Sequence, residues 1–175
     1  MTRIQRMATG MLPVMGIFCL FYVFYTAQNT LDFAILSPER WHDSRIVHPL
    51  AQIAQQTRII YAVVWLLPVV AGLAAVFTAI YLLNLVRQGL LFDERIASGF
   101  RIAGIAAAIS GGFDHLAHFL TPPILSWHNP DGALPASFHF NADSAGVILC
   151  GCMFWLVGWI LREAIHIARE NQGFI

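Results

Sequence analysis

TGMLPVMGIFCLFYVFYTA, residues 9 to 27, contains no Asp, Glu, Lys or Arg. A helix needs roughly 20 predominantly apolar residues to cross the hydrocarbon core of a bilayer, and in lipid it must satisfy its own backbone hydrogen bonds. The stretch therefore predicts a membrane-spanning helix. Arg3 and Arg6 precede it as in a signal peptide, but cleavage after Ala27 would place the large Tyr25 where a small residue is preferred, so we expect a retained anchor.

Three further apolar stretches of comparable length follow this one. They cover residues 59–83, 102–120 and 145–161, and the last continues into an amphipathic extension over residues 162–175. The chain of 175 residues is 58% hydrophobic and only 11% charged, which is far more apolar than an ordinary soluble domain. The sequence therefore predicts an all-α, integral membrane four-helix bundle that forms a single domain over residues 1–175.

The arginines that flank the four stretches predict an orientation. One side of the membrane holds Arg3, Arg6, Arg87, Arg95, Arg101, Arg162 and Arg169, and the other side holds Arg40, Arg45 and Arg58. Loops on the cytoplasmic side of a membrane carry the excess of positive residues. We therefore expect both termini in the cytoplasm.

The two loops on the opposite, outer side differ in composition. In residues 28–58, Ser37 can cap a helix and Pro38 suits its first position, which predicts a short outer-surface helix through Val47. Residues 121–143 are rich in Pro, Gly, Asn and Asp, so this loop is expected to turn repeatedly.

The third apolar stretch carries small residues at helical spacing. Gly104, Ala108 and Gly112 are four residues apart, and Gly111 follows Gly104 by seven. Small side chains let a neighbouring backbone approach closely, which is how membrane helices associate without a hydrophobic driving force. We expect these four residues to form the helix-packing face of the third helix.

A polar patch interrupts the same stretch at GGFDHLAHFL, residues 111–120. Asp114, His115 and His118 lie about one to two helical turns from its outer end, and ionisable groups in a span are costly. The first interpretation is structural. The side chains hydrogen-bond between helices and cap a packed helix pair, with Asp114 four residues before His118 and able to bond to it.

The alternative interpretation is a coordination site, because imidazole is a common ligand of transition metals and of haem. The candidate ligands share the outer side of the membrane: Asp114, His115, His118, His128 and His139, with Asp143 and Cys150 close in depth. The first, second and fourth apolar stretches contain no histidine, so haem would lack a second ligand within the membrane. These two interpretations stay open, together with a small-molecule or proton role for the same ionisable groups.

Several function classes are not expected. The formal net charge is zero, which disfavours nucleic-acid binding. No nucleophile elbow, phosphate loop or pair of catalytic carboxylates occurs, so we expect neither an enzyme nor, outside the coordination alternative, a cofactor. The three cysteines fall in apolar stretches and predict no disulfide.

The hairpin LLNLVRQGLLFDERIASGFRIAGI, residues 82–105, and the chain end LREAIHIARENQGFI, residues 161–175, resemble a known family. Its members are small bacterial four-helix integral membrane proteins with a domain of unknown function. The matching positions are Leu85, Arg87, Gly89, Phe92, Gly104, Glu170, Asn171, Phe174 and Ile175. The resemblance implies a bacterial membrane protein with both ends inside, and some members occur beside small helix-turn-helix regulators. It carries over no catalytic residue.

The preferred hypothesis is therefore a non-enzymatic protein of the bacterial inner membrane. It would lie in the lipid bilayer and pack, as an accessory or regulatory subunit, against another membrane protein or against copies of itself. The thirteen phenylalanines and five tryptophans offer apolar surface for such contacts. The competing hypothesis is a metal- or haem-binding membrane protein that uses the outer histidines.

Overall fold

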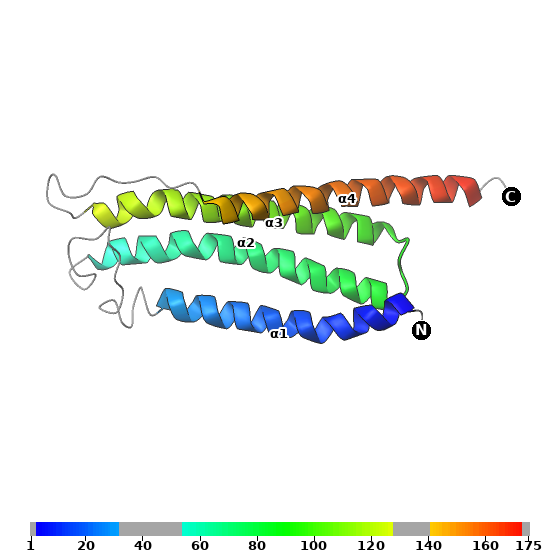
Figure 1. Ribbon diagram of the computed structural model, residues 1–175, viewed down its shortest axis with the longest axis horizontal. Coiled ribbons are helices and arrows are strands. Elements are labelled where there is room, and N and C mark those ends of the chain that lie inside the picture. Colours follow the sequence, from blue (N-terminus) through cyan, green and yellow to red (C-terminus); the bar gives the residue numbers. More distant parts are fainter. Residues whose placement is uncertain (1–2, 32–53, 128–140, 173–175) are drawn as a thin grey trace.

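The computed structural model describes residues 3–31, 54–127 and 141–172, and in this part of the chain it is built from helices alone (Figure 1). The helices are α1 (Arg3–Leu31), α2 (Gln55–Arg87), α3 (Glu94–Ser126) and α4 (Ala142–Gln172). All four are long and apolar enough to cross a membrane. The predicted all-α, four-helix membrane fold is therefore confirmed.

The helices pack as an open row in chain order. α1 contacts α2, α2 contacts α3, and α3 contacts α4, whereas no other pair among these four helices is in contact within the described residues. The start of α1, the α2–α3 connection and the end of α4 lie at one end of the molecule, here named the terminal end (Figure 1). The opposite end, where α1 and α3 finish and α4 begins, is named the loop end.

The helices are longer than the apolar stretches that predict them, because hydropathy marks only the part of a helix inside the hydrocarbon. The clearest correction concerns α3, which was expected to end at Leu120 but continues through Pro122 and Pro123 to Ser126. Thr121, Pro122 and Leu125 are buried, so packing against α2 holds this last turn in spite of the prolines. The predicted outer-surface helix lies outside the described residues.

The connection between α2 and α3 ends one helix and starts the next within six residues. Gly89 adopts a φ of +85°, and the N–H groups of Leu90 and Gly89 donate to the carbonyls of Leu85 (3.1 Å) and Val86 (3.0 Å). This is the Schellman arrangement that ends many helices at a glycine. Asp93 then caps α3, because its side chain accepts a hydrogen bond from the backbone N–H of Arg95 at 2.8 Å.

Among the described residues, buried apolar side chains form one cluster at each end of the row. At the loop end the cluster consists of Tyr61 and Leu125, and the other cluster lies at the terminal end. Leu82, Leu85 and Ile96 form this second cluster, on which Leu90 and Leu161 also pack. Most of the large apolar side chains elsewhere are exposed. Such surface is expected where lipid, instead of water, surrounds the helices.

Candidate functional site

α3 and α4 meet along a line of small residues, here named the seam. It consists of Ala97, Gly104 and Gly111 on α3 and of Ser144, Gly151 and Gly158 on α4. A Cβ atom added to Gly104 would lie 2.5 Å from the backbone nitrogen of Trp155 and 2.6 Å from the carbonyl oxygen of Gly151. The same test places a Cβ on Gly111 2.9 Å from the Ser144 carbonyl oxygen, and one on Gly158 2.8 Å from that of Ala97.

The predicted packing residues do not all lie in this seam. Gly104 and Gly111 belong to it, and Ala108 borders it, since a Cβ on Gly151 would lie 2.6 Å from the Ala108 nitrogen. Gly112 is a correction. It is exposed, and a Cβ placed on it meets no heavy atom within 4 Å, because one residue turns the helix by about 100° away from Gly111.

The α4 half of the seam was missed by the sequence reasoning, although a signal for it exists. Ser144, Gly151 and Gly158 recur every seven residues, as Ala97, Gly104 and Gly111 do on α3. Two antiparallel helices that present small residues with this repeat can keep close contact over several turns.

At the loop end of the seam, the carboxylate of Asp114 binds one residue of α4 and the residue that directly precedes this helix. Its Oδ2 accepts hydrogen bonds from Ser144 Oγ at 2.5 Å and from Asn141 Nδ2 at 3.3 Å. Asn141 precedes the first residue of α4, and its Oδ1 accepts from the backbone N–H of Asp143 at 3.1 Å. Asn141 therefore caps α4 with one end of its amide and binds α3 with the other.

His118 completes this polar cluster. Its Nδ1 lies 2.9 Å from the backbone oxygen of Asp114 but 3.7 Å from Oδ2, so the expected bond between the two side chains is replaced by one to the backbone. A carbonyl oxygen only accepts, so Nδ1 carries the proton in this arrangement. The Nε2 atom is then free to accept from Asn141 Nδ2, which lies 3.4 Å away.

α2 reaches the cluster from the other side of α3. The rings of Trp65 and His118 meet edge to face, with centroids 5.0 Å apart. Trp65 Nε1 donates to Thr121 Oγ1 at 3.2 Å, and that hydroxyl donates to the carbonyl oxygen of Ala117 at 2.7 Å. The polar cluster thus connects α2, α3 and α4 at one level.

The remaining candidate ligands are less clearly placed. His115 is half-buried on α3, whereas Cys150 is exposed on α4. His128 and His139 lie outside the described residues. Within the described ranges, no three His, Cys, Asp or Glu side chains stand close enough to hold a metal ion.

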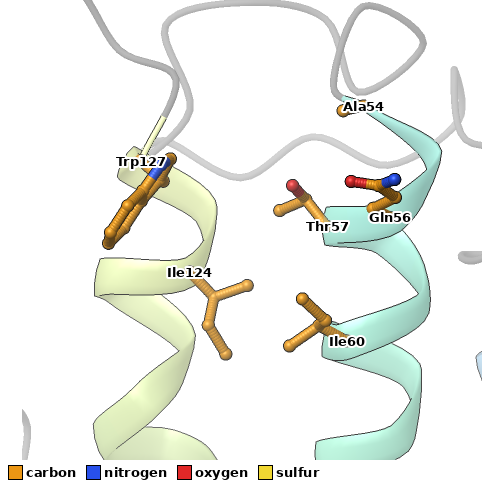
Figure 2. Close-up of a pocket in the computed structure, with 6 residues that line it drawn as sticks. All are labelled: Ala54, Gln56, Thr57, Ile60, Ile124 and Trp127. Carbon is orange, nitrogen blue, oxygen red and sulfur yellow. The ribbon is translucent and has the colours of Figure 1, made fainter.

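A pocket of about 410 Å³ opens between α2 and α3 at the loop end (Figure 2). Thr57 and Ile60 of α2 and Ile124 of α3 project into the gap between the two helices (Figure 2). Its described lining contains no titratable side chain: Ala54, Gln56, Thr57, Ile60, Ile124 and Trp127. These residues supply no acid, base or strong nucleophile, and no sequence spacing pointed to them.

Comparison with known proteins gives one family. The sequence profile of a family described as "Protein of unknown function (DUF2975)" matches residues 39–175. The match covers α2, α3 and α4, with the seam and the polar cluster, while α1 precedes it. No curated protein and no solved structure matches the chain.

Proposed function

This chain belongs to the DUF2975 family of proteins of unknown function, and we propose that it is a non-enzymatic accessory or regulatory subunit of another membrane protein. The open row of helices carries the proposal. Within the described residues the backbone of α1 lies beside α2 alone and that of α4 beside α3 alone, so these two outermost helices have apolar flanks that no other described helix covers.

Of these two outermost helices, α1 has the surface that is richer in closely spaced, exposed aromatic side chains. Ile17, Phe18, Phe21, Phe24 and Tyr25 are all more than 60% exposed, and together they are named the α1 ridge. Phe21 and Tyr25 stack with ring centroids 6.4 Å apart. Aromatic side chains are enriched where proteins meet. The ridge fits an apolar helix of a partner that lies in the same bilayer.

The polar cluster supports a structural role and not a catalytic one. The Asp114 carboxylate accepts from one donor on α4 and from one directly before this helix, and Asn141 uses both ends of its amide. A general acid or base needs a free position within hydrogen-bond reach of a substrate. These groups instead fix α4 against α3.

The location proposed for this subunit is the bacterial inner membrane, with both termini in the cytoplasm. The bias of arginine toward the terminal end of the molecule supports this orientation. The helix directions agree with it, because α1 starts and α4 finishes at the same end (Figure 1).

Site-specific photocrosslinking in native membranes tests the accessory role. A photoreactive residue at Phe21, in the α1 ridge, should give one discrete adduct with a different protein. The matched control is Ile109 on α3, which is also exposed but far from α1 in the row and should give none. The proposal fails if Phe21 gives no protein adduct, or if both positions give the same products.

The alternative function, a metal- or haem-binding membrane protein, is supported by the 3.7 Å approach of His118 Nδ1 to Asp114 Oδ2. It predicts a visible absorption band or stoichiometric metal in the purified protein, lost when His115 and His118 are replaced together. That result would contradict the preferred function.

A further inference from the structure

Two arginines share one tryptophan near the terminal end of the seam. The guanidinium carbon of Arg101 lies 5.1 Å from the ring centroid of Trp159, and that of Arg162 lies 5.4 Å from it. Gly158 makes room for this arrangement, since a Cβ there would lie 2.6 Å from Cγ of Arg101. The seam therefore places two guanidinium groups against the same indole ring, although like charges repel each other.

Two of the four described carboxylates near this end pair with other arginines. Asp93 Oδ1 lies 3.8 Å from Arg95 Nε, and Glu94 accepts a hydrogen bond from Arg169. Of the other two, Glu170 pairs with His166, and Glu163, next to Arg162 in the chain, is exposed. Neither Arg101 nor Arg162 forms an ion pair with a described carboxylate. Arg101 donates through Nη2 to Ser98 Oγ at 3.4 Å, whereas its Nε is buried with no hydrogen-bond partner among the described residues. Arg101 and Arg162 therefore supply both positive charge and N–H donors for binding an anion.

The two arginines lie at the level where hydrocarbon gives way to lipid headgroups. Arg101 comes directly before the third apolar stretch, and Arg162 comes directly after the fourth. Tryptophan favours this interface. Ile105, one helical turn deeper than Arg101, and Trp155, one turn deeper than Trp159, are 48% and 42% exposed. Apolar surface thus continues from the cations toward the middle of the membrane, where an acyl chain would lie.

We propose that Arg101, Trp159 and Arg162 bind the phosphate group of an anionic phospholipid. A guanidinium binds phosphate through a fork of N–H donors, and it keeps its charge while it stacks on an aromatic ring. Basic pockets between membrane helices bind acidic lipid headgroups in this way. The cationic headgroup of a zwitterionic lipid would add a third positive charge beside the two arginines. Free phosphate would make no contact with the apolar surface around Ile105 and Trp155.

Native mass spectrometry of the full-length protein in detergent tests this site. Phosphatidylglycerol should bind more tightly than phosphatidylcholine. Arg162→Gln should weaken phosphatidylglycerol binding about fivefold, and adding Arg101→Gln should bring the loss to roughly 25-fold if the two effects add. Arg87→Gln is the matched control: Arg87 is exposed, lies at the same end of the molecule and loses the same charge, so affinity should not change.

Each contrary result rejects the site. Equal binding of the two lipids would show that the net charge of the headgroup does not determine binding. An equal loss in Arg87→Gln would show charge attraction that is not specific to this pair. Inorganic phosphate that binds as tightly as phosphatidylglycerol would identify a site for free phosphate. Arg162 is exposed, so Arg162→Gln should fold even where the double variant does not, and unchanged affinity in it is decisive. The measurement needs no partner protein, so it is independent of the accessory role.

Discussion

The Asp114 carboxylate, at the loop end of the seam, holds α4 against α3 through two hydrogen bonds. A carboxylate within a membrane span is costly unless donors surround it. Ser144 of α4, which is only 1% exposed, and Asn141 directly before this helix supply those donors. The carboxylate therefore stabilises the close packing of α4 on α3, and separating the two helices would leave it without donors inside the membrane.

Ser144→Ala should destabilise the protein more than Ser110→Ala. Both serines donate to a neighbouring helix, Ser144 to the Asp114 carboxylate and Ser110 to the Pro68 carbonyl at 2.8 Å. A hydrogen bond to a charged group contributes about 1.5–3 kcal/mol, and a neutral one about 0.5–1.5 kcal/mol. Denaturant unfolding of each variant in the same detergent gives the free energy of unfolding. Equal losses would show that Asp114 draws no special stability from Ser144.

At this scale the sequence identified the unusual residues but not their partners. Asp114 and His118 stand out because they interrupt an apolar stretch. Asn141 lay in a segment expected to be a loop, and Ser144 is too common a residue type to attract notice. Which donor meets a carboxylate depends on how two helices are set against each other, and one sequence does not fix this.

At the scale of elements, the seam sets how closely α3 and α4 approach. At Gly104 and Gly151 the nearest atoms of the opposite helix are all backbone atoms, so a side-chain atom added there has no flexible neighbour to displace. Close packing of this kind stabilises membrane helices through van der Waals contact. One methyl group in the seam should therefore separate the helices along their length.

Gly104→Ala should destabilise the protein, whereas Gly112→Ala should not. The new methyl group at position 104 would lie 2.5 Å from the Trp155 nitrogen, and overpacking of this kind costs about 1–3 kcal/mol. At position 112 the space is open, and alanine exceeds glycine in helix propensity by about 1 kcal/mol. Thermal unfolding in detergent should shift in opposite directions. A loss of the same size in both variants would contradict the seam.

The elements themselves were largely predictable, and their ends were not. Long apolar stretches located all four helices, because lipid leaves few other structures for such segments. The α3 terminus at Ser126 was missed because Pro122 and Pro123 are turn signals in isolation. Tertiary packing of Thr121 and Leu125 against α2 outweighs that local signal.

At the scale of the whole molecule, the order of contacts is the feature that sequence could not supply. Hydropathy does not distinguish a helix with two neighbouring helices from one with a single neighbour. The position of α1 at the edge of the row could therefore not be predicted. The family match begins at residue 39, after α1. The unit formed by α2, α3 and α4 therefore contains both the seam and the polar cluster, while α1 adds an aromatic surface at its edge.

Cysteine labelling tests the orientation of the whole row. Gln88, at the end of α2, and Trp127, which is 82% exposed at the end of α3, lie at opposite ends of the molecule. In right-side-out vesicles, a charged maleimide that cannot cross membranes should label Trp127→Cys at once and Gln88→Cys only after permeabilisation. The native cysteines fall in the apolar stretches, out of reach of a charged reagent, so the unaltered protein is the unlabelled control. The reverse pattern would place the termini outside, and labelling of both variants from one side would contradict the transmembrane row.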